Sequence, residues 1–305
     1  MNIMGDRTRL KIMVVLLTLL GLAALAYTMV CLGLRRWQTR LIFVPDSHLQ
    51  ALPTSLGLEY EEVDLAVGEG NAAGTVQGWW IPADTNMPAP ADPVVLYLHG
   101  NGSNLGDLPA MAQRFHQLGW TSFLIDYRGY GRSQGPFPNE ERVYEDAEAA
   151  WIYLMQQRQI APQQVMVYGH SLGGAIGIEL ATRHPTMAGL IVEGSFTSMY
   201  DVVTGVGQYR FLPIDWILTQ RFESLEKVRS LPVPLLFLHG TEDDIIPPVM
   251  SQSLYDAATG AKSLVWITGA GHNNLPDVGG NLYVQALQSF ATQHVSPATT
   301  HANKP

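Results

Sequence analysis

The chain has few residues that could form a disulfide framework or a metal site. Among its 305 residues there is a single cysteine, Cys31, which excludes intramolecular disulfides and clusters of thiolate ligands. Its histidines and acidic residues show no H-E-x-x-H motif and no clustered spacing typical of a metal centre. We therefore predict that the functional site uses neither a metal nor a cofactor.

Sequence signals for phosphate and nucleic-acid binding are also lacking. The glycine-rich stretches near residues 100 and 129 have neither the lysine of a phosphate-binding loop nor the spacing of a dinucleotide-binding motif. Residues 1–40 hold six of the 18 basic and one of the 27 acidic residues, which leaves 12 basic and 26 acidic residues, formally −14, in the rest. Because such an acidic domain repels phosphate backbones, we predict no nucleic-acid partner.

One stretch, residues 12–34, lacks charged residues altogether. As a helix it would reach roughly 34 Å, enough to cross a hydrocarbon core of about 30 Å with some tilt. Basic residues flank both of its ends, and we predict a single transmembrane helix. The alternative is a cleaved signal peptide with Ala24-Leu25-Ala26 as its cleavage site. The apolar run continues past Ala26, however, which an anchor needs and a signal does not.

The predicted segments are a basic tail (1–11), the transmembrane helix (12–34), a juxtamembrane linker (35–54), a globular domain (55–294) and a flexible tail (295–305). Three basic residues and the α-amine, less Asp6, precede the apolar stretch, and three basic residues follow it. Since basic residues prefer the cytoplasmic side, this small difference favours a cytoplasmic N-terminus. The globular domain of this single-pass protein is then expected on the non-cytoplasmic side.

Beyond residue 55, strand-like and helix-like segments alternate, which predicts a mostly parallel sheet with helices on both faces. The expected strands are 60–67, 75–81, 94–98, 121–125, 165–168, 189–192, 234–238 and 263–267. The expected helices are 107–118, 140–157, one that follows the fifth strand and ends near 183, 248–259 and 281–294. Residues 196–230 break the alternation, and because they are rich in aromatic and large aliphatic side chains we interpret them as a small apolar flap.

The most informative motif is Gly169-His170-Ser171-Leu172-Gly173, which follows the strand-like run 165–168. A serine between two glycines at a turn from strand to helix is typical of the nucleophile elbow of a serine hydrolase. Such a tight turn leaves no room for Cβ atoms two residues before and after the serine. We therefore predict Ser171 as a nucleophile.

A serine nucleophile needs a base, which in such hydrolases lies on a loop after a later strand. Most of the nine histidines lie before the sheet, on expected helices, inside the elbow or in the tail. His99 and His239 each end a strand as His-Gly, where a buried imidazole is expected to bond to the loop backbone. His272, in the turn GAGHNN after the last strand, is the predicted base. The alternative is an exposed loop histidine.

An acid that orients this histidine is expected after the penultimate strand, in the stretch HGTEDDIIP. Three adjacent acidic residues compete for the role. We predict Asp243, with Asp244 as the alternative and Glu242 on the surface. The two that do not take this role are expected to form ion pairs or to cap a helix.

The negatively charged oxygen that forms during acyl transfer needs two preorganised N–H donors, each typically worth about 3 kcal/mol of barrier lowering. One is expected to be the amide of Leu172, at the start of the helix after the elbow. The other is expected from the loop HGNGSN after the third strand, with the amide of Asn101 as the best candidate. The alternative for this loop is a plain turn.

Four motifs in register, HGNGSN, DYRGYGRS, GHSLGG, and HGTEDDIIP with GAGHNN, resemble those of the α/β-hydrolase superfamily. The resemblance covers about residues 55–294. It implies the α/β-hydrolase fold, an eight-stranded and mostly parallel sheet flanked by helices, here preceded by one transmembrane helix. It also implies a catalytic triad of Ser171, Asp243 and His272.

Within the superfamily the chain is similar to membrane-anchored serine hydrolases near the serine-aminopeptidase and prolyl-oligopeptidase branches. These share a single N-terminal span and a sequence like Phe43-Val44-Pro45 before the first strand. The resemblance does not specify the substrate, because this branch includes esterases, thioesterases and peptidases.

An apolar flap beside a membrane anchor favours acyl chains over peptides. We therefore expect a membrane-tethered serine hydrolase that cleaves carboxylic esters or thioesters, small or lipid-like, through an acyl-enzyme. The alternatives are a serine peptidase of the aminopeptidase-like branch and a catalytically inactive, membrane-tethered scaffold.

Overall fold

The computed structural model describes residues 3–84, 86, 92–205, 207, 209 and 211–296. Its centre is one sheet of eight strands in the order β1-β2-β4-β3-β5-β6-β7-β8, which confirms the predicted strand number. The strands are β1 (Glu61–Val67), β2 (Gly74–Ile81), β3 (Val94–Leu98), β4 (Thr121–Ile125), β5 (Val165–His170), β6 (Gly189–Glu193), β7 (Leu235–Gly240) and β8 (Lys262–Ile267).

The sheet is mostly parallel, as predicted. The hairpin of β1 and β2 is antiparallel, β2 is antiparallel to β4, and the six strands from β4 to β8 in the sheet order run parallel to one another. In β3 and β6 every residue is buried, as expected where helices cover both faces of a parallel sheet. The side chains of successive residues point to opposite faces of the sheet. Leu96 packs in one core cluster, and its neighbours Val95 and Tyr97 pack in the other.

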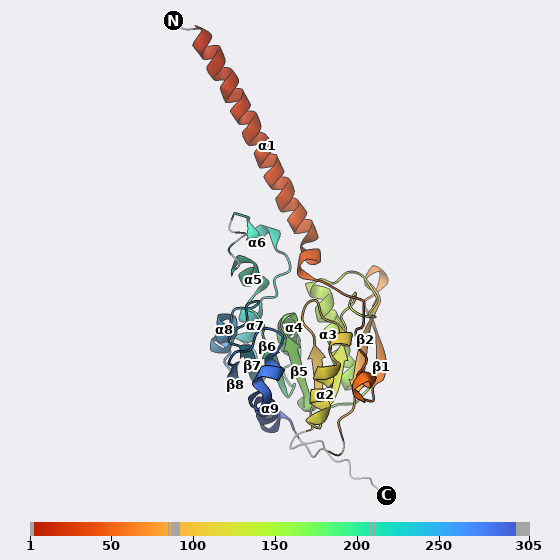
Figure 1. The fold of residues 1–305 in the computed structure, drawn as a ribbon. Coiled ribbons are helices and arrows are strands. Elements are labelled where there is room, and N and C mark those ends of the chain that lie inside the picture. Colours follow the sequence, from red (N-terminus) through yellow and green to blue (C-terminus); the bar gives the residue numbers. More distant parts are fainter. Residues whose placement is uncertain are drawn as a thin grey trace.

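Helices cover both faces of the sheet (Figure 1). Those of the globular domain are α2 (Pro109–Gln117), α3 (Glu140–Gln156), α4 (Leu172–Arg183), α5 (Met199–Gly205), α6 (Ile214–Ile217), α7 (Ser224–Val228), α8 (Val249–Ala257) and α9 (Leu275–His294). Short 3-10 turns lie at η1 (Pro53–Leu56), η2 (Gly70–Ala72), η3 (Leu105–Asp107) and η4 (Pro162–Gln164). The core cluster on one face includes α3 and α4 residues, and the cluster on the other includes α2 and α9 residues.

The last helix differs from the prediction, which had it begin at residue 281. Helix α9 begins at Leu275 and is interrupted at Gly280, whose φ of 45° and ψ of −120° are not helical. Pro276, in the first turn, favours the early start because proline has no N–H to satisfy there. The prediction therefore matched only the second part of this helix.

An N-terminal helix, α1 (Ile3–Ile42), contacts the globular domain through its C-terminal end and projects away from it (Figure 1). Between Arg7 and Ile42 it is long and apolar enough to cross a membrane, and only 6% of its most apolar window is buried. So little burial distinguishes α1 from a core helix of a soluble domain. The helix contains the predicted span 12–34 and continues through residues 35–42, where a linker was expected.

The C-terminal tail was predicted from residue 295. Val295 is buried, and the amide of Ser296 donates a hydrogen bond to the carbonyl of Gln163 over 3.1 Å. The rest of this predicted segment lies outside the described residues.

Hydrogen bonds of the Asp126 and Arg128 side chains brace the loop that follows β4. The fully buried guanidinium of Arg128 donates from Nε to Oδ1 of Asp146 over 2.6 Å. Oδ1 of the Asp126 carboxyl group accepts a hydrogen bond from the amide of Leu105 over 2.8 Å. Burial nevertheless raises the pKa of Asp126 to about 8, more than this hydrogen bond lowers it.

The pKa of Asp126 predicts a pH-dependent stability. Between pH 3.8 and about pH 8 the folded protein keeps the Asp126 proton, whereas the unfolded chain loses it. The contribution of this proton to the free energy of unfolding is therefore complete below pH 3.8 and is lost as pH rises towards 8. In the wild type the free energy of unfolding should fall by up to about 1.4 kcal/mol per pH unit between pH 3.8 and about pH 8. Replacing Asp126 by Asn should remove this decrease. Thermal unfolding of both proteins between about pH 5 and pH 8 measures the difference. Parallel stability curves would show that Asp126 is ionised when buried.

Candidate active site

Ser171 lies at a sharp turn between β5 and α4. Its φ of 54° and ψ of −116° are strained for a residue with a side chain. A Cβ on Gly169 would lie 2.2 Å from the carbonyl oxygen of Gly173, and one on Gly173 would lie 2.0 Å from that of Leu98. The backbone therefore requires glycine on both sides of the serine, which is the reason for the motif that the sequence presents.

The structure brings together the three residues predicted as a triad. His272 lies in the turn between β8 and α9, and its Nε2 is 3.0 Å from Oγ of Ser171. Its Nδ1 is 2.7 Å from Oδ2 of Asp243, which follows β7. Because a carboxylate can only accept a hydrogen bond, Nδ1 carries the proton and Nε2 is free to accept one from the serine hydroxyl. His272 is only 7% exposed, which excludes the alternative of an exposed loop histidine.

Asp243 is held as an ionised acceptor. Its Oδ1 accepts hydrogen bonds from the amides of Ile245 and Ile246, over 3.0 and 2.8 Å, and Nε2 of His239 lies 3.2 Å from Oδ2. Burial alone would raise the pKa of this carboxyl, but the hydrogen bonds from His239, His272 and Ile246 outweigh it and hold the pKa well below the ordinary value. The neighbouring acids at 242 and 244 are exposed and away from the imidazole.

The two predicted oxyanion donors border the serine. Leu172 is the first residue of α4, so its N–H has no acceptor within the helix. Asn101 lies in the loop after β3, and among the described residues its backbone N–H has no acceptor. Both residues line a cavity that contains Ser171. The role of these amides remains a prediction.

The side chain of Asn101 has a role that the sequence did not indicate. Its Nδ2 donates to the carbonyl of Ile42, the last residue of α1, and its Oδ1 accepts from the amide of Val44 over 2.9 Å. The hydroxyl of Tyr130 donates to the same Oδ1 over 2.9 Å. One residue of the loop therefore joins the end of α1 to the surroundings of Ser171.

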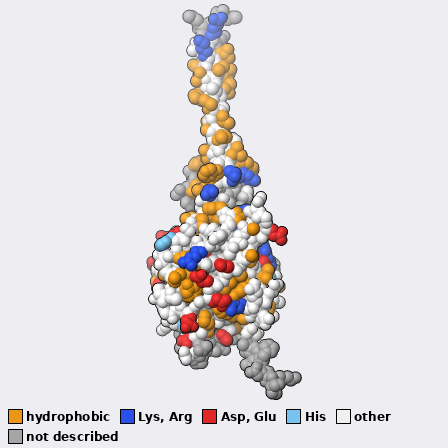
Figure 2. All heavy atoms as spheres, turned by 90° about the vertical axis from the view of Figure 1, so that its right-hand side faces the viewer, with side chains coloured by type: hydrophobic (Ala, Val, Ile, Leu, Met, Phe, Trp, Pro, Cys, Tyr) orange, Lys and Arg blue, Asp and Glu red, His pale blue; other side chains and the backbone are white. Residues whose placement is uncertain are grey.

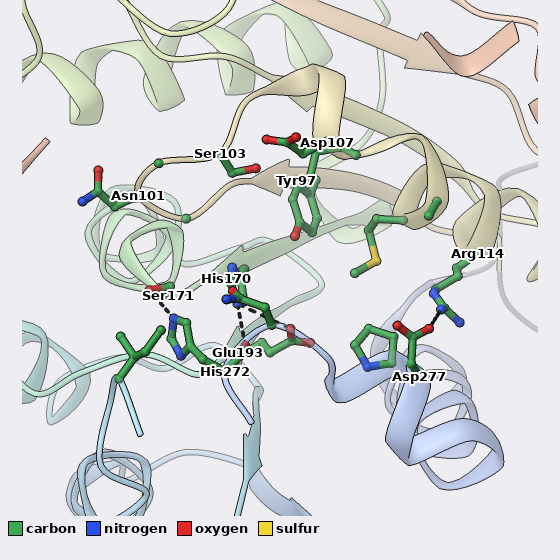
Figure 3. A pocket seen from close by; sticks show the side chains of 18 residues that line it. Tyr97, Asn101, Ser103, Asp107, Arg114, His170, Ser171, Glu193, His272 and Asp277 are labelled. Atoms are coloured by element: carbon green, nitrogen blue, oxygen red, sulfur yellow. Dashed lines mark hydrogen bonds and ion pairs between the residues drawn. The ribbon is translucent and has the colours of Figure 1, made fainter. Parts of the chain in front are cut away.

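Ser171 lies between two cavities, and both also border Asn101 and Ile245. The first, here called the polar pocket, has a volume of about 550 Å³ and extends from Ser171 to the ion pair of Arg114 and Asp277 (Figure 3). The second, the apolar pocket, has a volume of about 580 Å³. Its walls are residues of the flap, the end of α1 and Ile246; they include Leu34, Leu41, Phe196, Met199, Val203, Leu212 and Ile217.

Two residues beside the serine were not predicted as part of the site. Glu193, at the end of β6, is 2% exposed and accepts hydrogen bonds from the hydroxyls of Tyr168 and Tyr283. His170 lies 3.1 Å from the carbonyl oxygen of His272 through its Nε2, and burial lowers the pKa of its imidazole. Both line the polar pocket (Figure 3). The sequence signals that could have pointed to them are the place of His170 inside the elbow and that of Glu193 at the end of the next strand.

The other strand-end histidines have the structural role that was predicted. His99 is completely buried, its Nδ1 lies 2.7 Å from the carbonyl of Gly100, and burial lowers its pKa to about 4. His239 contacts the carbonyl of Ile246 and the hydroxyl of Ser251. Within the described ranges, no group of three or more His, Cys, Asp or Glu residues is arranged to hold a metal ion.

Comparison with known proteins gives consistent matches. Residues 89–226 match the Hydrolase_4 family model, described as serine aminopeptidase, S33. An uncharacterized protein of Mycobacterium tuberculosis is 31% identical over 277 residues, which cover 91% of this chain and 95% of that protein. Human alpha/beta hydrolase domain-containing protein 17B is 30% identical over 66% of this chain and 67% of its own length.

The chain belongs to the α/β-hydrolase superfamily.

Solved structures agree with this assignment. The Pyrococcus furiosus esterase Pf2001 superposes with a TM-score of 0.66 at 18% identity, covering 84% of this chain and 99% of the esterase. At that identity the likeness is one of fold. As a member of the α/β-hydrolase superfamily with this fold, the protein is a hydrolase.

The geometry distinguishes the two candidate acids of this α/β hydrolase. Asp243→Asn should slow the reaction of Ser171 with a fluorophosphonate probe by about 10³- to 10⁴-fold, because the amide favours the wrong imidazole tautomer. Asp244→Asn is the matched control and should react within about threefold of the wild type, since exposed substitutions away from the site have small effects. Labelling rates measure both, with Ser171→Ala as the blank.

A Ser171→Ala protein that is labelled like the wild type would remove Ser171 from the mechanism. Equal labelling rates for Asp243→Asn and the wild type would remove Asp243 from the mechanism.

Proposed function

We propose that the protein is a membrane-tethered serine hydrolase that cleaves carboxylic esters or thioesters of acyl chains. The observation that carries the proposal is the hydrogen-bonded series Ser171–His272–Asp243 at the junction of an apolar and a polar pocket. Such a junction suits a substrate with a hydrocarbon acyl part and a polar leaving group.

The proposed reaction has two halves. Oγ of Ser171 attacks the acyl carbonyl while Nε2 of His272 takes the hydroxyl proton, and the amides of Leu172 and Asn101 stabilise the oxyanion. Collapse of the intermediate breaks the bond to the leaving alkoxide or thiolate, which receives the proton from His272. A water molecule then attacks the acyl-enzyme, with His272 again as the base, and releases the carboxylic acid while Ser171 regains its proton.

The composition of the apolar pocket supports acyl chains as the part of the substrate bound there. Its walls are aliphatic and aromatic, apart from Gln38 and the site residues Asn101 and Ser171. The amide group of Gln38 is occupied by the carbonyl of Ile217 and the amide of Thr219. Burying each methylene of an acyl chain against such a surface is worth about 0.8 kcal/mol.

The alternative of an aminopeptidase-like enzyme requires an acidic group for the free amine of a peptide. Three acidic residues line the polar pocket, but each already has a partner. Glu193 accepts from two tyrosine hydroxyls, Asp277 pairs with Arg114, and Asp107 accepts from the amide of Asn104. These contacts favour the ester and thioester hydrolase over the peptidase.

Helix α1 supports the proposed tether, since it is apolar and, apart from Cys31 and the half-buried Leu34, exposed over the predicted span. The orientation that the charges favour, with the catalytic domain on the non-cytoplasmic side, is part of this proposal. Reporter fusions at the C-terminus test it.

An intact nucleophile, base and acid in hydrogen-bonding contact argue against the inactive scaffold.

A substrate series tests the proposed function. We expect the full-length protein to hydrolyse p-nitrophenyl esters and acyl thioesters, with kcat/KM rising with chain length as methylenes fill the apolar pocket, by up to about fourfold per methylene. Ser171→Ala should be inactive on the whole series. Amino-acid amides cleaved in preference to every ester and thioester would replace this proposal with the peptidase.

A further inference from the structure

The flap lies along α1 over several helical turns. At the far end, the hydroxyl of Tyr27 donates to the carbonyl of Phe211 over 2.7 Å. Nearer the domain, the guanidinium of Arg35 lies 5.0 Å above the ring of Trp216 and donates to its carbonyl. The buried Gln38 completes the contact with the flap through Ile217. The position of the flap is therefore set relative to the helix and not only relative to the sheet.

These contacts place Phe211, here called the tip of the flap, beside Tyr27 of the predicted transmembrane span. Tyr27 precedes Arg35 by eight residues, roughly 12 Å along a helix. If Arg35 marks the headgroup level, where basic residues end the apolar stretch, Phe211 lies beside the hydrocarbon. Phe211 is 74% exposed, and Trp216 is 47% exposed at the level of Arg35. Tryptophan at the membrane surface and an apolar side chain below it are the arrangement expected of an embedded element.

Basic residues mark the same level around α1. Arg35, Arg36 and Arg40 line a shallow pocket together with Arg142 of the domain. In Figure 2, Lys and Arg side chains gather where the helix meets the globular domain. Anionic headgroups attract such residues and so offset the repulsion expected from the acidic domain. The one acid on α6, Asp215, forms an ion pair with Arg221.

The apolar pocket connects this level to Ser171. Leu34, the last residue of the predicted span, and Leu41 form its wall on the side of α1, and Leu212 and Ile217 form the wall on the side of the flap. Its other end reaches Ser171. A hydrocarbon chain that passes between these walls would avoid the free-energy cost of exposure to water.

We propose that the tip of the flap is embedded in the bilayer, and that the acyl chain of a membrane-resident substrate enters the apolar pocket laterally between α1 and the flap. The anchor helix is then one wall of the acyl-binding site, while the polar leaving group occupies the polar pocket. The substrate class, long-chain esters or thioesters presented by a bilayer, rests on the proposed function. The embedding of the flap does not.

The first experiment compares two substrates in liposomes that contain the full-length protein. One is a long-chain acyl ester held in the same bilayer, and the other is water-soluble p-nitrophenyl butyrate. A charge inserted at membrane depth is costly, so Phe211→Asp should lower hydrolysis of the bilayer ester by about tenfold or more relative to the soluble ester. Leu282→Asp, a substitution at an exposed leucine of α9, is the matched control and should leave this ratio unchanged. An unchanged ratio for Phe211→Asp would overturn lateral entry.

The second experiment needs no turnover. With Cys31 replaced by Ala, an environment-sensitive NBD fluorophore is attached to Phe211→Cys or, as the control, to Leu282→Cys. On reconstitution the label at 211 should shift to shorter wavelength and be quenched by nitroxide-labelled lipids, whereas the label at 282 should not. Equal behaviour of the two labels would overturn the embedding. If the flap proves embedded but no ester or thioester is cleaved, the proposed function fails and the membrane contact stands.

Discussion

The hydrogen bonds made by the side chain of Asn101 connect helix α1 to the surroundings of Ser171. Its side-chain amide group binds the carbonyl of Ile42 and the amide of Val44, and Asn101 lines the same cavity as Ser171. An anchor joined to the domain by a flexible linker would leave the site independent of the helix. Here helix α1 continues into the domain, so the position of the helix and the shape of the loop that contains Asn101 depend on each other.

Neighbouring elements also hold the strained backbone at Ser171 in place. Ser171 keeps its unusual backbone angles because β5 is fixed in the middle of the sheet and α4 packs directly against it. Close backbone contacts at Gly169 and Gly173 leave no room for a side chain at either position. The imidazole and carboxylate come from loops after β8 and β7, which are neighbours in the parallel sheet. Rigid elements therefore determine the distances between the side chains of Ser171, His272 and Asp243.

Local patterns were sufficient to predict most strands and the residues of the site that follow strand ends. Ser171 was recognisable from its glycines, and His272 from its position after the last strand, because both signals lie within a few residues of sequence. The contacts of Asn101 with Ile42 and of Gln38 with the flap could not be predicted in this way, since they join segments distant in sequence. The early start of α9 was missed because Gly280 interrupts its pattern.

We propose that the acyl part of the substrate lies between α1 and the flap, with its reacting carbon at Ser171. A structure of the full-length protein inhibited by a long-chain alkyl fluorophosphonate tests this most directly. We expect phosphorus bound to Oγ of Ser171, its oxygen near the amides of Asn101 and Leu172, and the alkyl chain against Leu34 and Leu41 of the helix. An alkyl chain that lies in the polar pocket, towards Arg114 and Asp277, would contradict it.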